Sequence, residues 1–203
     1  LKYLIFPPWL NAASSNNVGD VRNILVKLIS TSFIDVKWIS WFFVNVFFIL
    51  LAPSYWRRNE KVFFANSGTE ANEGALKLAV KWGKEININK TEIISTLNGF
   101  HGRTTGALAL TGQPGKQEPF STILPAVKYI NYNSIENLKA AVNENTCAIF
   151  LEAIQGEGGI IELDIEFVKE LHALRDKYNF LIIMDEIQAG LGRTASELYA
   201  YED

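Results

Sequence analysis

The sequence predicts an α/β domain of three layers, in which helices cover both faces of a mainly parallel sheet, from about residue 60 onward. Two observations indicate this class. Short apolar, β-branched runs alternate with stretches of helical periodicity, as in chains that fold from repeated strand–helix units. The run Phe180 to Met184 (FLIIM) is apolar at every position, which is typical of a strand buried on both faces.

The first strand and helix of this domain are clearly marked. Lys61 to Ala65 (KVFFA) is a short apolar run followed by the turn Asn66-Ser67-Gly68. The apolar positions after the turn have helical spacing: Ala71, Ala75, Leu78, Ala79 and Trp82. Ser67 followed by Glu70 fits a capping box, which satisfies free N–H groups of the first helical turn. We therefore expect a strand, a glycine turn and a helix.

The same alternation continues along the chain. Further strands are predicted over residues 91–96, 127–132, 147–152 and 180–184. Helices are predicted within residues 99–110, 134–142 and 164–178. The helix over 134–142 places Ile135, Leu138 and Val142 on one face, and Asp164 is the expected cap of the helix that follows it.

Composition excludes several classes of protein. The chain has 203 residues, of which 48% are hydrophobic and 20% charged, as in an ordinary globular domain. Nineteen basic and 22 acidic residues give a formal charge of −3. This charge argues against nucleic acid and against an anionic membrane surface as binding partners. One cysteine and two histidines exclude an internal disulfide and a structural zinc site, and indicate a reducing compartment.

Residues 1–58 differ in composition from the domain predicted over residues 59–203. The densest part of this segment, Trp38 to Ala52 (WISWFFVNVFFILLA), has Ser40 and Asn45 as its only polar residues. A spanning helix needs ~20 apolar residues, so the run is short for a transmembrane segment. Three alternatives stay open: a transmembrane segment, a buried or interfacial segment, and a non-native segment from a misassigned gene start.

Polar residues that follow the predicted strands are the candidates for a functional site. In an open parallel sheet these residues meet at the edge where the strands end, and ligands bind there. They are residues 66–69, residues 98–103, Glu152 with residues 155–159, and residues 185–188. Ser67, Gly68 and Thr69 at a helix start form either a phosphate cradle or an ordinary cap. Asp185, after the most apolar strand, needs a hydrogen-bonding or cationic partner, or else caps the next segment.

Other interpretations of these residues are weaker. The run LIIMDE, which ends in Asp185 and Glu186, resembles a Walker B strand. A Walker B strand requires a glycine-rich loop ending in Gly-Lys-Ser/Thr, and the chain has none. The glycines near Glu157 have the wrong spacing for a dinucleotide fingerprint. His101 is either a general base or a polar turn residue, and the sequence favours the turn residue because no nucleophile lies near it.

Four ordered motifs together resemble the class III aminotransferases, which depend on pyridoxal phosphate (PLP). They are NSGTEANEGALKLA (66–79), FHGRTTGALALTGQP (100–114), EAIQGEGG (152–159) and MDEIQAGLGRT (184–194). The second motif is most similar to acetylornithine aminotransferases. The resemblance covers Lys61 to Asp203 and implies an incomplete large domain of the fold-type I PLP enzymes.

The resemblance also implies roles for individual residues. Gly68 and Thr69 would hold the cofactor phosphate, Phe100 would stack on the pyridine ring, and Asp185 would pair with the protonated ring nitrogen. The cofactor-binding residues implied are Ser67, Gly68, Thr69, Phe100, Asp185, Glu186, Ile187 and Gln188. By the same resemblance, Gln188 would hydrogen-bond the phenolic oxygen of the cofactor, and Arg103 would bind the substrate carboxylate. Glu157 would lie near the substrate entrance, and Glu152 would support these residues without contacting the substrate.

The family's reaction and its lysine set the functional expectation. The implied reaction moves an amino group from N-acetylornithine to 2-oxoglutarate in arginine biosynthesis, in a homodimer of the mitochondrial matrix or cytoplasm. The family's Schiff-base lysine lies farther beyond the Asp motif than this sequence extends, and no lysine follows Asp185. Residues 1–56 show no counterpart of the family's N-terminal segment. We therefore expect this chain alone to be inactive. The alternative is a non-catalytic interaction protein or membrane-tethered protein derived from such an enzyme.

Overall fold

A parallel sheet forms the centre of the molecule in a computed structural model, which describes residues 2–6, 26–27, 29–30, 61–190, 192–194 and 200. Its strands have the order β2-β10-β7-β5-β6, and every neighbouring pair is parallel. The strands are β2 (Val26–Lys27), β5 (Glu92–Thr96), β6 (Lys128–Ile130), β7 (Thr146–Leu151) and β10 (Leu181–Met184). The predicted mainly parallel sheet is confirmed.

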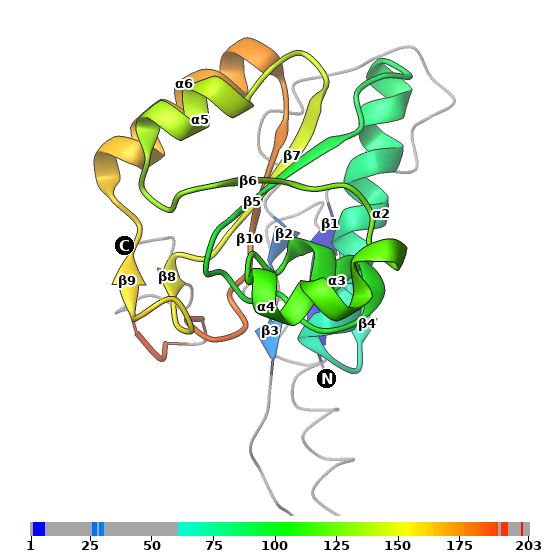
Figure 1. The fold of residues 1–203 in the computed structure, drawn as a ribbon, viewed down its shortest axis with the longest axis vertical. Coiled ribbons are helices and arrows are strands. Elements are labelled where there is room, and N and C mark those ends of the chain that lie inside the picture. Colours follow the sequence, from blue (N-terminus) through cyan, green and yellow to red (C-terminus); the bar gives the residue numbers. More distant parts are fainter. Residues whose placement is uncertain are drawn as a thin grey trace, which may run out of the picture.

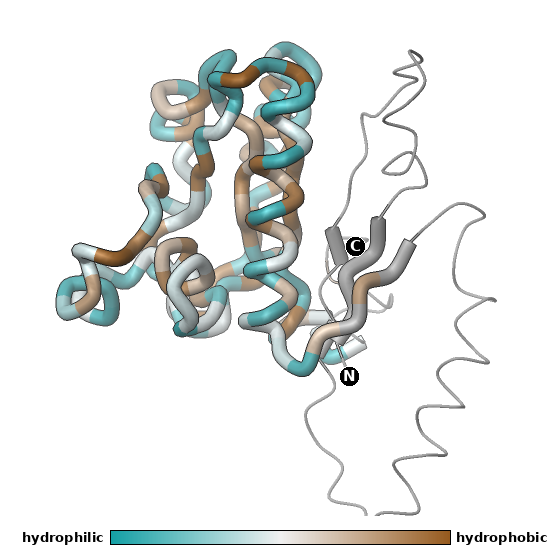
Figure 2. Tube along the Cα trace, turned by 90° about the vertical axis from the view of Figure 1, so that its right-hand side faces the viewer, coloured by the Kyte–Doolittle hydropathy of each residue, from teal (hydrophilic) through white to brown (hydrophobic). Residues whose placement is uncertain are grey.

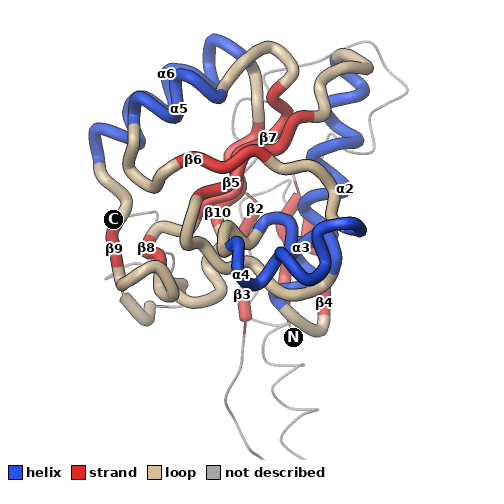
Figure 3. Tube along the Cα trace, viewed as in Figure 1, coloured by secondary structure: helices blue, strands red, loops and turns tan. Residues whose placement is uncertain are grey.

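Helices cover both faces of this sheet (Figures 1 and 3). The helix α2 (Gly68–Ile86) lies on one face, and α5 (Ile135–Ala141) and α6 (Ile165–Tyr178) lie on the other. Side chains of β10 alternate between the two cores: Leu181 and Ile183 pack with α2, whereas Ile182 and Met184 pack with α5 and α6. A strand apolar at every position is therefore buried on both sides, as the sequence predicted.

Small side chains bring α2 close to the sheet. Ala71, Ala75 and Ala79 are fully buried, and Trp82 closes the same face. At Gly83 an added Cβ would overlap the backbone of Lys90 and come within 2.7 Å of the Cys147 Cβ. In Figure 2 the hydrophobic colour follows the central strands and one side of the helices. The helical spacing read from the sequence therefore identifies the buried face of α2.

The predicted strand Lys61–Ala65 exists as β4, but it belongs to a different sheet. Its sheet has the order β3-β1-β4, and β1 (Lys2–Phe6) pairs antiparallel with β4 and with β3 (Ile29–Ser30). The partner strands come from residues 1–58, which the sequence analysis had set apart. The apolar run Trp38 to Ala52 lies outside the described residues. Among the residues described, no helix is long and apolar enough to cross a membrane.

Several short elements complete the sheet edge where the strands end. After β5 the chain forms α3 (Thr105–Leu110), within the stretch predicted to turn into a helix. It continues into α4 (Pro114–Gln117) and the 3-10 helix η2 (Glu118–Ile123). After β7, β8 (Ile154–Gln155) and β9 (Ile161–Glu162) form a short antiparallel hairpin. The sequence analysis did not predict α4, η2 or this hairpin.

Candidate functional site

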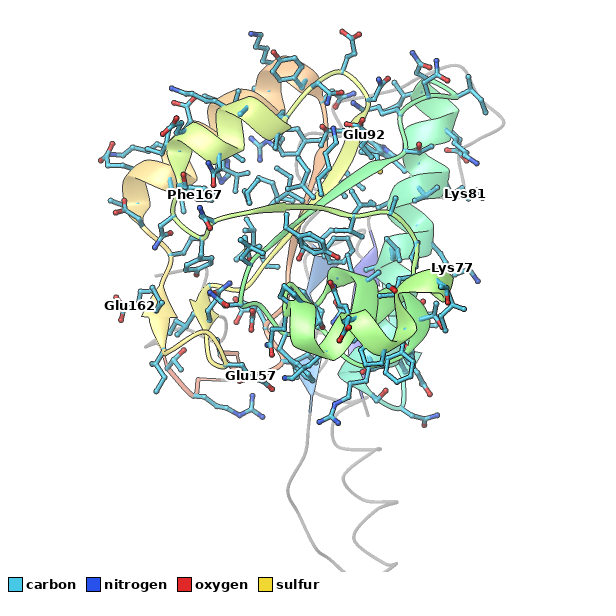
Figure 4. The ribbon with its side chains drawn as sticks, in the orientation of Figure 1. Lys77, Lys81, Glu92, Glu157, Glu162 and Phe167 are labelled. Atoms are coloured by element: carbon cyan, nitrogen blue, oxygen red, sulfur yellow. The ribbon has the colours of Figure 1, made fainter. Side chains whose placement is uncertain are left out.

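The polar segments that follow the strands meet, as predicted, at one edge of the sheet. The Phe100 N–H, after β5, donates to Glu152 Oε2, after β7, at 3.2 Å. An added Cβ at Gly156 would meet the Gln188 side chain, which follows β10. Figure 4 shows Glu157 at this end of the molecule and Glu92, at the start of β5, at the opposite end. The carboxyl ends of β5, β7 and β10 therefore form one candidate site.

The start of α2 supplies backbone N–H groups to this site. Ser67 is the N-cap, and its Oγ accepts a hydrogen bond from the Glu70 N–H at 3.2 Å. Glu70 Oε2 accepts from the N–H of Asn66 at 2.8 Å, one residue before the cap, so the predicted capping box forms in a shifted version. The N–H groups of Gly68 and Thr69 lie in the first turn, at the positive end of the helix dipole. This terminus suits an anion.

The Asp185 carboxylate lies at the end of β10 and is 4% exposed. Its Oδ2 accepts hydrogen bonds from Asn72 Nδ2 at 2.8 Å and from His101 Nδ1 at 2.9 Å. Its Oδ1 accepts from the backbone N–H of Ile187 at 3.1 Å. Asp185 therefore has the partners that its burial demands, and it also caps the segment that follows it.

The interpretation of His101 as a polar turn residue, which the sequence favoured, is corrected by the structure. Its imidazole is fully buried beside Asp185, and its backbone N–H donates to Thr111 Oγ1 at 2.9 Å. Burial lowers the pKa of His101, but the hydrogen bond and charge of Asp185, aided by Glu152, outweigh it and raise that pKa above its usual value. Asn72 was not among the predicted site residues. A usable signal existed: Asn72 is a polar residue beside Ala71 on an otherwise apolar helix face.

Glu152 is a second buried carboxyl group at the site, with 3% exposure. Burial raises its pKa to about 7, the charge of Asp185 adds to this effect, and His101 opposes it. Glu152 is therefore largely protonated below neutral pH, while it still accepts the Phe100 N–H.

The predicted substrate residues Arg103 and Glu157 lie at the exposed rim. Lys116 Nζ contacts Glu157 Oε2 at 2.6 Å and lies 4.8 Å from the centre of the half-buried Phe100 ring. The Lys116 hydrogen bond lowers the pKa of Glu157, and Arg103 contributes to this shift. Lys116, which the sequence analysis did not select, and Glu157 line a cavity of about 460 Å³ with Asn98 and Gln113.

The segment after Asp185 connects the two ends of the site. Ile187 packs against the start of α2, since a Cβ added at Gly68 would lie 2.8 Å from the Ile187 side chain. Gln188 is exposed. Glu186 instead is fully buried, and its Oε2 accepts from the Ala200 N–H at 3.1 Å. Among residues 185–188, Glu186 therefore faces the protein interior.

The donor set fits pyridoxal phosphate. The α2 terminus suits the phosphate, and the Phe100 ring offers an aromatic face. A carboxylate accepts about four hydrogen bonds, and Asp185 receives three from the protein, so it retains capacity for a ring N–H. Within the described part of the chain, His, Cys, Asp and Glu side chains form no cluster suited to a metal ion.

Comparison with known proteins decides the family. The sequence profile of the family Aminotransferase class-III matches residues 21–203. The chain belongs to this family. The match begins inside residues 1–58, so the similarity to class-III aminotransferases extends into the segment for which the sequence analysis expected no family counterpart.

Curated relatives of this chain include acetylornithine-type aminotransferases. The acetylornithine/succinyldiaminopimelate aminotransferase of Buchnera aphidicola subsp. Schizaphis graminum is 50% identical over 143 residues, which is 70% of this chain and 35% of the relative. The acetylornithine aminotransferase of Clostridium acetobutylicum is 40% identical over 200 residues, 96% of this chain and 51% of the relative. The chain therefore spans about a third to a half of the length of these relatives.

Solved structures agree with this assignment. The ornithine aminotransferase of Toxoplasma gondii, with PLP at partial occupancy in its active site, has a TM-score of 0.63 and 35% identity over 68% of this chain and 33% of its own. The omega transaminase of Pseudomonas jessenii in complex with PMP has a TM-score of 0.62 and 27% identity over 69% of this chain and 36% of its own. The fold is that of the PLP-dependent aminotransferases, and PLP is the cofactor that this family membership identifies.

Proposed function

We propose that the protein, expressed from its full reading frame, transfers an amino group from N-acetylornithine to 2-oxoglutarate, a step of arginine biosynthesis. One observation carries the proposal: a buried, hydrogen-bonded Asp185 carboxylate lies beside the start of α2 in a class-III aminotransferase chain. The names of the curated relatives support the acetylated amino donor.

The described residues hold and orient PLP in this proposal. The N–H groups of Gly68 and Thr69 bind the phosphate at the positive end of α2. The Phe100 ring covers one face of the pyridine and excludes water, and Gln188 donates to the phenolic oxygen. Asp185 accepts the ring N–H and so keeps the ring nitrogen protonated.

Bound PLP supplies an electron sink for the negative charge left when the carbon that bears the amino group loses its proton. A lysine that moves this proton is required in addition, and no lysine follows Asp185 in the 203 residues of this chain. We therefore propose that the 203-residue chain binds PLP without catalysing turnover.

The rim residues select the substrate in this proposal. The Arg103 guanidinium is exposed and binds the carboxylate of the amino donor through paired hydrogen bonds. Glu157 borders the cavity of about 460 Å³ and discriminates among donors by its charge. We also propose that the full protein is a homodimer, which the exposed Phe120 and Ile123 of η2 support. The single buried cysteine supports a reducing compartment, the mitochondrial matrix or the cytoplasm.

The test measures glutamate formed from N-acetylornithine and 2-oxoglutarate. The full-reading-frame protein should form glutamate, the Asp185→Ala variant should lose most of this activity, and the 203-residue chain should bind PLP and form none. Light scattering on the full protein reports the dimer. Failure of the full protein to produce glutamate from any amino donor would refute the proposed transamination, whereas activity with ornithine alone would refute only the proposed donor.

A further inference from the structure

Asn72, His101 and Asp185 form a buried hydrogen-bonded group, called here the Asp185 cluster. Its members come from three separate parts of the chain: the first turns of α2, the loop after β5, and the end of β10. Asn72 is 1% exposed, His101 2% and Asp185 4%. The roles proposed above use Asp185 alone and leave the other two side chains without a function.

The orientation of Asn72 is fixed by its partners. Its Nδ2 donates both to the His101 carbonyl and to Asp185 Oδ2, each at 2.8 Å. Turning the amide over would point its oxygen at two acceptors, so only one orientation is compatible with these contacts. Asn72 therefore uses its amide hydrogens to hold the His101 backbone and the Asp185 carboxylate together.

The two carboxylate oxygens of Asp185 accept different numbers of hydrogen bonds. Oδ2 accepts from Asn72 Nδ2 and His101 Nδ1, whereas among the described residues Oδ1 accepts only from the Ile187 N–H, at 3.1 Å. Since a carboxylate oxygen accepts about two hydrogen bonds, Oδ2 is saturated and Oδ1 has capacity for one more donor. The cluster distinguishes the two oxygens before any ligand arrives.

The cluster is also incomplete, which a purely structural role would not favour. Asn72 Oδ1 and His101 Nε2 are buried and have no hydrogen-bond partner in the described structure. Unpartnered buried polar atoms are costly and uncommon in native interiors, so each of these two atoms requires an explanation.

We propose that Asn72 and His101 are positioning residues that hold the Asp185 carboxylate in one orientation, with Oδ1 left to accept the ring N–H of PLP. The inference rests on the proposed function, because it concerns the same cofactor. Its electrostatic basis is the group of charges around His101. Asp185 and Glu152 are the titratable groups that act on the imidazole, and both raise the pKa of His101 against the effect of burial.

The first experiment tests the pairing without cofactor. NMR of labelled imidazoles follows each histidine of the full-reading-frame protein, and His101→Asn and His172→Asn variants assign the signals of the two histidines in these 203 residues. We expect the His101 proton affinity to fall at least about tenfold in Asp185→Asn, while that of His172 is unchanged. An unchanged His101 titration in Asp185→Asn would overturn the proposal.

The second experiment measures PLP affinity and the 15N shift of ring-labelled PLP on the apo-protein. His101→Phe and Asn72→Leu each remove one donor to Oδ2. Each variant should bind PLP about tenfold more weakly or worse. In each, the ring nitrogen of bound PLP should lose its proton at a lower pH than in wild type. His101→Asn keeps a donor near the Nδ1 position and should restore most of the affinity. His172→Phe, at an exposed position of α6, is the matched control and should behave as wild type.

The outcomes separate this inference from the proposed function. If His101→Phe and Asn72→Leu bind PLP as tightly as wild type, with the same ring-nitrogen shift, the positioning role is wrong. Loss of stability with an unchanged ring-nitrogen shift also contradicts it. If wild type itself binds no PLP, the proposed function fails, and the ligand-free titration still decides whether His101 and Asp185 are paired.

Discussion

Replacing Glu152 with glutamine should stabilise the protein at alkaline pH and leave it unchanged near pH 5. Burial raises the pKa of this carboxyl from 4.5 to about 7. Between these values the folded state keeps the proton and the unfolded state releases it, so the wild type loses stability as pH rises through this window. Glutamine resembles the protonated acid and still offers an oxygen to the Phe100 N–H, which lies 3.2 Å from the carboxylate.

The magnitude follows from the difference in proton affinity. A tenfold change in affinity corresponds to ~1.4 kcal/mol, so the upper limit of the effect is about 3 kcal/mol above pH 7. The charge of His101 is already included in this shift, and we expect ~1–3 kcal/mol. Urea unfolding followed by tryptophan fluorescence at pH 5, 6, 7 and 8 measures it for wild type, Glu152→Gln and the exposed control Glu118→Gln. Equal pH dependence of wild type and Glu152→Gln would refute the assigned burial cost, and a less stable variant at pH 8 would reverse its sign.

Substitutions at two positions and one labelling experiment test the local structure. Ser67→Ala removes the cap of α2 and should lower the free energy of unfolding by ~1 kcal/mol, with Ser67→Asp close to wild type in the same urea assay. Gly83→Ala forces a methyl group against the Lys90 backbone and should cost roughly 2–3 kcal/mol, whereas Gly115→Ala, which meets nothing within 4 Å, should be neutral in thermal unfolding. Burial raises the pKa of Cys147 to about 12, so a thiol reagent should label it in urea and leave the native protein unmodified at pH 8.

Periodicity predicted the elements of the sheet because each strand and helix carries its own burial pattern. The spacing of Ala71, Ala75 and Ala79 identified the buried face of α2, and the apolar run at residues 180–184 identified β10. The partner of a strand is not encoded in this way. The run Lys61–Ala65 has the composition of a strand in either sheet, and its pairing with Lys2–Phe6 depends on residues far away in the sequence.

The residues of the candidate site also differ in how far the sequence could predict them. Asp185 was identified because a carboxylate after an apolar strand needs a partner wherever that partner lies. Its partners were not identified, because Asn72 and His101 are 113 and 84 residues away from Asp185 along the chain. His101 lies between Gly99 and Gly102, a composition typical of an exposed loop, and the sequence carries no signal that the side chain is buried.

The first turns of α2 explain why two of the sequence motifs have the spacing that they do. Gly68 and Asn72 are four residues apart and therefore share one face of the helix. That face contacts the end of β10 at two points: Gly68 lies against Ile187, and Asn72 donates to Asp185. One helix–strand contact thus sets the anion-binding terminus and the carboxylate at a fixed separation. A side chain at position 68 would push Ile187 away and displace both ends of the site together, so a substitution of Gly68 should affect phosphate binding and Asp185 at the same time.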